Sequence, residues 1–198
     1  MPVPVPVTQP CNKCGASKLV FSSDPWKSYL QTQVKSLGVT EEQKNDTQAF
    51  ITVNTKQFNL STTGFLAVTV DACTGNVIKH MVFLKQDSTM VQYFKAGIPA
   101  RSIVLLASRG QPDGFDGVAQ HLVPLGAAKV ADLQGKESLS FFGFQGASSP
   151  PSWVSLLMNQ GKEVVEKYIP LSLDEYLCSP DTEPPQRKDL ELLRKAGN

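Results

Sequence analysis

The chain has 198 residues, of which 41% are hydrophobic and 19% charged, and its formal net charge is +1. This composition is typical of one globular domain and excludes a wholly disordered chain. Because no basic run or acidic tail stands out, we expect neither nucleic acid nor an anionic membrane as a partner. No apolar run reaches the roughly 18 residues that a spanning helix needs, so we expect no membrane insertion.

The beginning of the chain and its cysteines indicate where the protein works. Residues 1–10 alternate proline and valine and predict an extended arm, without the charged and apolar regions of a signal peptide. A secreted protein would therefore be in its mature form here. Four scattered cysteines favour two disulfides in a secreted, extracellular chain. The sequons at Asn45 and Asn59 are compatible with that compartment.

Strand signals dominate the first part of the chain. Residues 16–22 and 48–55 predict strands, the second because it is β-branched and alternating. The segment 24–38 is ambiguous, because its hydrophobic residues recur at helical spacing and a glycine could end a helix there.

A hairpin is predicted next, in the stretch "GFLAVTVDACTGNVIKHMVF". Residues 64–70 have apolar side chains on both faces, which predicts a central strand covered on both sides. Residues 76–83 predict its partner strand. The turn between them, "DACTGN", is rich in turn-forming residues and holds Cys73.

Two helices and a buried strand follow the hairpin. Asp87 predicts the N-cap of a helix that Gly97 ends. Residues 102–108 are continuously apolar and predict a buried strand. Asp113 predicts the start of a second helix, which has apolar residues at i, i+3, i+4 and i+7 and stops at Gly126.

The last part of the chain completes the predicted fold. Residues 138–146 predict an apolar strand, 152–161 a short helix, and 163–171 a last strand or edge segment. Residues 181–198 predict a polar tail. This order of hairpins and crossovers favours a mixed sheet with helices packed on it, as one domain over residues 11–180.

Motifs of catalysis and cofactor binding are absent from the sequence. It has no GxSxG, P-loop, GxGxxG or HExxH pattern, so we expect no cofactor and no enzyme. The pair Cys11 and Cys14 follows a proline-rich arm rather than a strand of a βαβ unit, which disfavours a redox site. A zinc site needs four ligands, and His80 and His121 stand alone, so we expect no metal.

Between Gly64 and Ala147, the blocks "GFLAVTVDACTGNVIKHMVF", "YFKAGIPARSIVLLASRGQPDG", "VAQHLVPLGA" and "ESLSFFGFQGA" come in one order. These blocks resemble the interleukin-like epithelial–mesenchymal-transition inducer family, whose relatives include the pancreatic-derived factor. The resemblance implies an α/β sandwich of two antiparallel-rich β-sheets lined by short helices and stabilised by two disulfides.

The resemblance also implies function. Secreted members of the family act as cytokine-like or hormone-like factors without a catalytic site. The same domain forms the stem of protein O-linked-mannose N-acetylglucosaminyltransferase, where it binds carbohydrate, and it occurs in cell-surface hyaluronan-binding proteins.

Four residues are candidates for a carbohydrate site, two of them from the resemblance. In the stem domain a basic residue at the end of the apolar strand contacts sugar, and Arg109 occupies the matching position. The family's aspartate after the hairpin is Leu84 here, and Asp87 is its candidate substitute. Asp113 and Asp116 lie close to Arg109 in sequence. The alternative is that Arg109 is a surface ion-pair partner and Asp113 a helix cap.

Tyr93, Trp26 and Trp153 are candidate platforms for a sugar ring, with core packing as the alternative. We favour a secreted, lectin-like protein that binds carbohydrate and is not an enzyme. The alternative is a secreted signalling factor that acts through a protein receptor. Agglutination would need at least two sites, as in a homodimer.

Finally, the resemblance implies a pairing of the cysteines. Cys14 matches the family cysteine that precedes the first strand and pairs with the late cysteine, here Cys178. Cys11 and Cys73 then remain for the second disulfide, which would fasten the arm to the hairpin turn. By the loop-entropy model, a bridge across so long a loop stabilises by about 3–4 kcal/mol.

Overall fold

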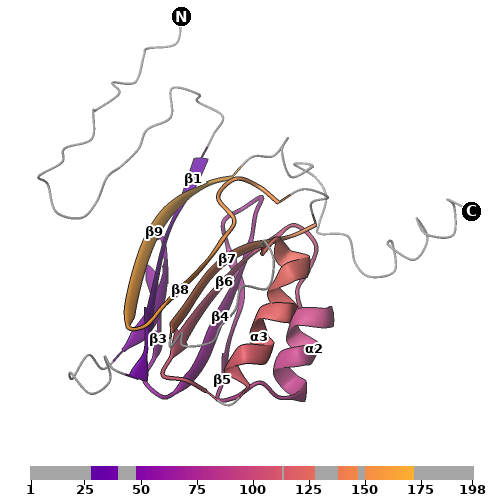
Figure 1. Cartoon of the computed structure of the whole chain (residues 1–198). Coiled ribbons are helices and arrows are strands. Elements are labelled where there is room, and N and C mark those ends of the chain that lie inside the picture. The colour runs from indigo at the N-terminus through magenta and orange to yellow at the C-terminus, as the bar shows by residue number, and fades with distance from the viewer. Residues whose placement is uncertain (1–27, 40–47, 113, 128–137, 147–149, 172–198) are drawn as a thin grey trace, which may run out of the picture.

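The computed structural model describes residues 28–39, 48–112, 114–127, 138–146 and 150–171 (Figure 1). Strands predominate in this part of the chain, and short helices pack on one side of them. The strands are β1 (Ser28–Leu37), β2 (Ala49–Val53), β3 (Lys56–Leu60), β4 (Gly64–Asp71), β5 (Val77–Phe83), β6 (Ser102–Arg109), β7 (Ser138–Gln145), β8 (Ser155–Asn159) and β9 (Lys162–Leu171). The helical elements are α2 (Ser88–Ala96), α3 (Phe115–Leu122) and the 3-10 turn η1 (Val123–Leu125).

Hydrogen bonds join the nine described strands in one mixed sheet with two halves. The β1 half has the order β3-β2-β1-β9, and the β6 half has the order β5-β4-β6-β7-β8. Every pairing within a half is antiparallel, and one parallel pair, Leu37 with Arg109, connects the halves. The expected antiparallel-rich structure with short helices is therefore confirmed, but the two expected sheets are joined at this corner.

Two hydrophobic cores lie on opposite faces of the β6 half. The first core lies between the two halves and includes Leu30, Ile51, Val68, Leu105 and Phe142. The second core lies between the β6 half and the helices, which Figure 1 shows on the right. Its members include Phe65, Met90, Tyr93, Leu106, Val118 and Phe141. Full burial of each such side chain contributes about 1.5–3 kcal/mol of transfer free energy, so both cores stabilise the β6 half.

The central strands of the β6 half, β4, β6 and β7, are buried almost throughout, whereas β5 and β8 are more exposed. In β4, Phe65 and Ala67 face the helices, whereas Leu66, Val68 and Val70 face the β1 half. This arrangement confirms the predicted central strand and the hairpin with β5. The helix after Asp87, the buried strand β6, helix α3 and strand β7 are confirmed as well.

The structure differs from the sequence-based expectation at three places, of which β1 and β3 belong to the β1 half and β8 to the β6 half. The ambiguous segment 24–38 contains strand β1, the expected helix over 152–161 is wrong because β8 lies there, and β3 had no prediction. Leu30 and Val34 are four residues apart, a spacing that places two residues on the same face of a helix. It also places them on the same face of a strand, where side chains at even spacing point the same way. The buried Thr32 lies between them, and its Oγ1 donates to the Lys167 carbonyl over 2.9 Å. Pairing with β9 therefore decides for a strand.

A buried serine cluster fastens the corner at which the halves meet. Ser36 Oγ donates to the Leu139 carbonyl over 2.8 Å and accepts a bond from Ser108 N over 3.2 Å. Ser36 Oγ also lies 2.8 Å from Ser140 Oγ, and Ser108 Oγ accepts a bond from Leu139 N over 2.8 Å. All three serines are fully buried, so these bonds replace the water that their hydroxyls would otherwise need.

The hairpin turn has the chemistry that its sequence predicts. Asp71 Oδ1 accepts bonds from Cys73 N over 2.9 Å and from Thr74 N over 2.7 Å. Gly75 then adopts a φ of +73°, which side chains disfavour. Cys73 is disulfide-bonded, and its partner lies outside the described residues.

Several predictions lie outside the described residues. They are the arm 1–10, the strand 16–22, the tail 181–198, Trp26, Cys11, Cys14 and Cys178. The pairing of Cys11 with Cys73 and of Cys14 with Cys178 therefore stays a prediction. Among the residues that are described, no helix is both long enough and apolar enough to cross a membrane.

Candidate functional site

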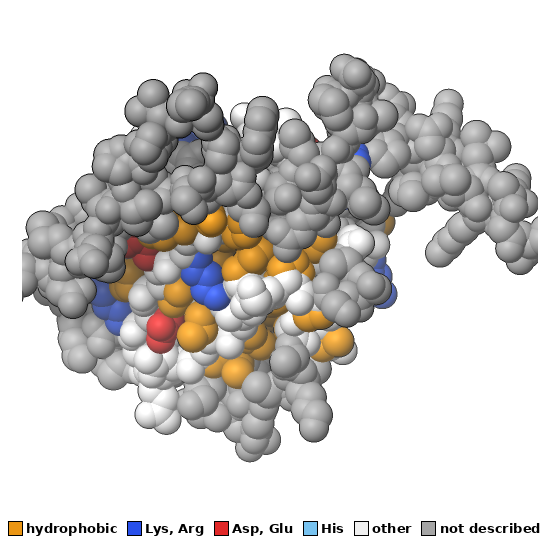
Figure 2. Space-filling view, turned by 90° about the horizontal axis from the view of Figure 1, so that it is seen from above, with side chains coloured by type: hydrophobic (Ala, Val, Ile, Leu, Met, Phe, Trp, Pro, Cys, Tyr) orange, Lys and Arg blue, Asp and Glu red, His pale blue; other side chains and the backbone are white. Residues whose placement is uncertain are grey.

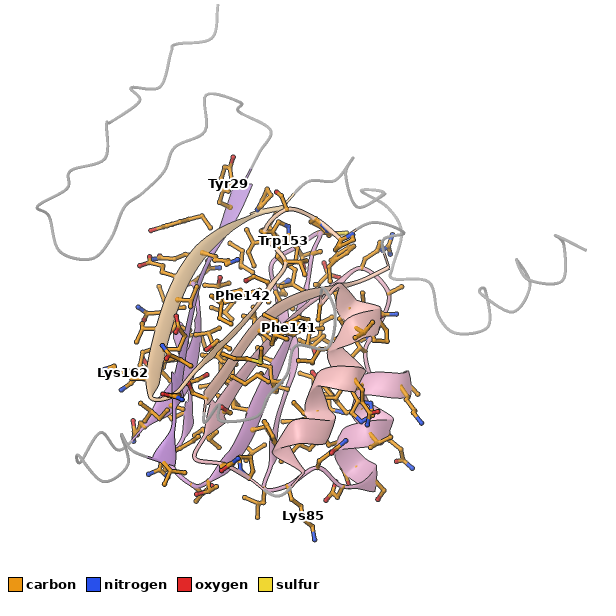
Figure 3. The ribbon with its side chains drawn as sticks, viewed as in Figure 1. Tyr29, Lys85, Phe141, Phe142, Trp153 and Lys162 are labelled. Atoms are coloured by element: carbon orange, nitrogen blue, oxygen red, sulfur yellow. The ribbon has the colours of Figure 1, made fainter. Side chains whose placement is uncertain are left out.

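The sheet brings several strand ends together at one edge, which we call the Arg109 edge. Strand β1 ends at Leu37, β6 ends at Arg109 and β5 ends at Phe83, and β4 begins there at Gly64. Figure 3 shows Lys85, in the loop after β5, at the lower end of the molecule and Tyr29 at the opposite, upper end. Strand ends of this kind present side chains to ligands, because the sheet holds their backbones rigidly.

Arg109 is half-buried and has a fixed backbone at this edge. Its Nη1 donates to the Ser61 carbonyl, and Gly110 N donates to the Leu37 carbonyl over 2.8 Å. The backbones are close together here, since a Cβ at Gly64 would lie 2.5 Å from the Phe83 carbonyl oxygen. Gly64 is therefore required for β4 and β5 to meet beside Arg109.

A second cation lies in the same cross-strand row as Arg109. Leu37 pairs with Arg109 on one side and with Lys162, the first residue of β9, on the other. Strands lie about 4.8 Å apart, so the backbones of Arg109 and Lys162 are separated by roughly 10 Å. Lys162 is exposed, and Figure 3 shows it on the left flank. No sequence pattern indicates this cationic row (Arg109, Leu37, Lys162), because residues so far apart in the chain become neighbours only through strand pairing.

Asp87 is at the same edge, at the start of α2, and acts as a helix cap. Its Oδ1 accepts bonds from Thr89 N over 2.9 Å and from Met90 N over 3.1 Å. The predicted N-cap at Asp87 is therefore confirmed, whereas the N-cap of α3 is Gly114, which has no side-chain cap. Asp113 lies outside the described residues, and Asp116 lies in α3 with its side chain not described. A contact of these three carboxylates with sugar stays a prediction.

Gln86 joins the loop before α2 to helix α3. Gln86 Nε2 lies 2.9 Å from His121 Nε2, so the amide donates when the imidazole is neutral. Burial, together with the charge of Lys95, lowers the pKa of His121 and favours that neutral form. A Cβ at Gly117 would lie 2.2 Å from Gln86 Oε1. A glycine inside a helix costs about 1 kcal/mol against alanine, so Gly117 was the available sequence signal for this close approach.

The described candidate platforms belong to the cores. Tyr93 is buried with its hydroxyl bonded to Thr69 Oγ1, and burial raises its pKa to about 12. Trp153 is buried edge-on against Phe144, with ring centroids 6.1 Å apart. The core-packing interpretation is therefore correct for both.

The upper end of the molecule contrasts with the Arg109 edge. Seen from above, its described surface is mainly hydrophobic, with a few charged side chains of both signs among the apolar ones (Figure 2). Near Trp153, Lys167 Nζ donates to the Trp153 carbonyl and to Ser155 Oγ, each over 2.7 Å. Lys167 Nζ also lies 4.9 Å from the centre of the Phe142 ring, and burial lowers the pKa of this lysine. The Lys167 ammonium therefore already contacts groups of the protein itself.

Comparison with known proteins gives one family and several relatives. The family model for "Interleukin-like EMT inducer" matches residues 63–147. "Cell surface hyaluronidase" of Danio rerio is 58% identical over 98% of this chain, and "Cell surface hyaluronidase CEMIP2" of Homo sapiens is 42% identical over 98%. "Cell migration-inducing and hyaluronan-binding protein" of Mus musculus is 32% identical over 62% of the chain. This chain spans 14% of the length of each of the first two relatives and 9% of the third.

These relatives correct one expectation. The expectation that the protein is not an enzyme is contradicted, because two relatives that match 98% of the chain are named hyaluronidases. Motifs could not indicate enzymatic activity, because the chain contains no GxSxG, P-loop, GxGxxG or HExxH pattern. The protein receptor and the homodimer stay predictions.

The expected relationship, by contrast, is confirmed. The matched segment begins next to Gly64 and holds β4, β5, α2, β6, α3, η1 and β7, hence all of the β6 half except β8. The relatives' names also include hyaluronan binding. Residues 63–147 therefore belong to the interleukin-like EMT inducer family, and the chain is a protein that carries this domain.

Proposed function

We propose that this chain binds hyaluronan at the Arg109 edge, as part of a hyaluronan-degrading protein at the cell surface. The names of the relatives support the ligand and the location. The observation that carries the site is the cationic row, in which Arg109 and Lys162 flank Leu37 across three strands. The domain would hold the polymer so that the hyaluronidase acts on a bound chain.

The chemistry of hyaluronan fits such a row. The polymer alternates glucuronate with N-acetylglucosamine, so carboxylates recur along it at regular intervals. An arginine guanidinium can bind a carboxylate or acetamido oxygen with two parallel N–H groups, and a lysine ammonium provides a compact charge. Because the row is at the surface, its attraction for a polyanion would weaken as salt is added.

Titration of this chain with hyaluronan oligosaccharides tests the proposal. We expect binding at low salt that weakens at 0.5 M NaCl, and no binding of chitin oligosaccharides, which have acetamido groups but no carboxylates. Lys162→Ala should weaken binding severalfold, because the exposed Lys162 makes its contribution through charge. The matched control is Lys56→Ala, since Lys56 is also exposed but lies at the far end of β3.

Arg109 needs a gentler substitution, because its guanidinium also holds the Ser61 carbonyl. Arg109→Lys keeps the charge but loses the planar fork, so we expect weaker binding with an unchanged unfolding temperature. If the Lys162→Ala variant and the Arg109→Lys variant both bind hyaluronan as tightly as the unsubstituted chain, the Arg109 edge is not the site. Failure of the unsubstituted chain to bind any hyaluronan oligosaccharide at low salt would contradict the function itself.

A further inference from the structure

The solvent face of the β1 half carries a row of side chains that the proposed function does not use. The pairings place Asn59 of β3 opposite Phe50 of β2, Phe50 opposite Lys35 of β1, and Lys35 opposite Val164 of β9. All four side chains point away from the core, because their strand neighbours fill it. Phe50 is half-buried, and Val164 is 45% exposed. Lys35 Nζ lies 5.7 Å from the centre of the Phe50 ring, so the row combines two apolar side chains with a cation and an amide.

Asn59 begins an intact N-glycosylation sequon at the end of this row. The sequon is Asn59-Leu60-Ser61, with no proline at its middle position. Asn59 and Ser61 are exposed, whereas Leu60 is buried in the core and fixes the strand. Gln57 Nε2 donates to Asn59 Oδ1 over 2.7 Å, and that bond is compatible with a sugar on the other amide atom, Nδ2.

Space for a glycan exists on this face. The described helices pack on the β6 half, on the far side of the molecule from β3 (Figure 1). Strand β3 is also an edge strand, which pairs only with β2 among the described strands. A bulky group at Asn59 would thus displace no described element.

We propose that Asn59 carries an N-linked glycan whose first sugar packs on the ring of Phe50. Directly opposite residues of an antiparallel pair have Cβ atoms about 4.5–5.5 Å apart, so a sugar on Asn59 starts beside that ring. The apolar face of the pyranose would cover Phe50, and the next sugars would continue along the row toward Lys35 and Val164. The inference depends on the sequon and the β1 half and is independent of hyaluronan binding.

The reaction needs a lipid diphosphate-linked oligosaccharide as co-substrate, as the secretory pathway supplies. The bond from Asn59 Nδ2 to C1 of the first sugar forms, and the bond from C1 to the diphosphate oxygen breaks. The lipid diphosphate leaves with the electron pair of that bond, and Nδ2 loses one proton. No oxidation or reduction occurs.

Mass spectrometry of the chain secreted from animal cells tests the attachment. Peptide N-glycosidase in H₂¹⁸O should convert Asn59 to aspartate with ¹⁸O incorporated. Ser61→Ala should abolish this label and Ser61→Thr should retain it, because threonine also completes a sequon. An unmodified Asn59 in the secreted chain would overturn the proposal.

A second measurement tests the packing on Phe50. Glycans trimmed to the first sugar should leave an unfolding temperature a few degrees above that of the Asn59→Gln chain. In the background of Phe50→Thr, a β-branched replacement suited to a strand, this difference should vanish. If that variant does not fold, the hydrogen-exchange rates of β2 can be compared in the unsubstituted chain with and without the trimmed glycan. Contact with Phe50 should slow exchange when the sugar is present. An unfolding temperature or exchange rate that does not depend on the sugar would refute the contact.

Discussion

The centre of the β6 half is buried on both faces, whereas the β1 half has one face on the core and one face toward solvent. Strands β4, β6 and β7 lie between two hydrophobic cores, and nearly all their residues are buried. Strands β1, β2 and β9 alternate buried and more exposed residues instead. The family match, residues 63–147, covers the first kind of structure and not the second.

The two kinds of structure contribute different residues to the proposed sites, one set from the family-matched segment and one from the strands that flank it. The matched segment contributes Arg109 and the frame that holds it. The flanking strands contribute Lys162, Asn59 and Phe50, hence the second cation of the row and the proposed glycan face. The hyaluronan proposal therefore depends on how the two halves meet, at Leu37 and Arg109, whereas the glycan proposal depends on the β1 half alone.

Removing a large side chain from the β6 half should have the largest effect. Phe141 is fully buried against the helices, and truncation of such a residue costs about 3–5 kcal/mol. We expect Phe141→Ala to lower the free energy of unfolding by that amount in urea titrations. Val164→Ala on the β1 half should change it by less than about 0.5 kcal/mol. Equal losses in the two variants would break the contrast between the halves.

Weakening the corner should have an intermediate effect. Ser36→Ala removes the acceptor of Ser108 N and a partner of Ser140 Oγ in a fully buried site. Leaving such groups unpaired costs about 1–3 kcal/mol, to be measured by urea unfolding. The control is Thr62→Ala, which changes an exposed hydroxyl near the same edge. A loss no larger than in this control would show that the serines do not fasten the halves.

Removing the cap of α2 should cost about 1 kcal/mol. Asp87→Ala loses the bonds to Thr89 N and Met90 N, while Asp87→Asn keeps an acceptor and should retain most of the stability. Thermal unfolding and hyaluronan titration are to be measured together. Unchanged stability with lost binding in the alanine variant would make Asp87 a sugar contact, as its sequence position first suggested.

The smallest expected effect is a pH dependence from His121. Burial and Lys95 lower its pKa in the folded chain below the unfolded value of 6.5. The unfolded state then binds more protons, so folding stability should fall as pH decreases through 6.5 toward the folded pKa. His121→Gln should flatten the fall in unfolding temperature between pH 7.5 and 5.5. A variant with the same slope as the unsubstituted chain would show that the Gln86–His121 contact does not sense pH.

The accuracy of the sequence-based predictions depends on how continuously each strand is buried. The continuous apolar runs of β4, β6 and β7 are unambiguous, and Asp87 precedes its helix with the usual capping geometry. In β1, by contrast, the spacing of Leu30 and Val34 fits a helix and a strand alike, and only pairing with β9 decides. Strand β8 is short and half-buried, so its apolar residues also suited a helix.

The site could be predicted only in part, because it is assembled by long-range pairing. Arg109 could be located from the family resemblance, but Lys162 becomes its neighbour only through β1. The contact of Gln86 with His121 likewise depends on the packing of α2 beside α3. Enzymatic activity in the relatives could not be predicted from motifs, since none of those sought occurs in this chain.

Hydrogen exchange of this chain with and without a saturating hyaluronan oligosaccharide tests hyaluronan binding at the Arg109 edge most directly. We predict new protection where the strand ends meet, in peptides that contain Leu37, Ser61, Arg109 and Lys162, and no change around Trp153 at the upper end. Protection confined to the upper end, or to the solvent face of the β1 half, would contradict the account.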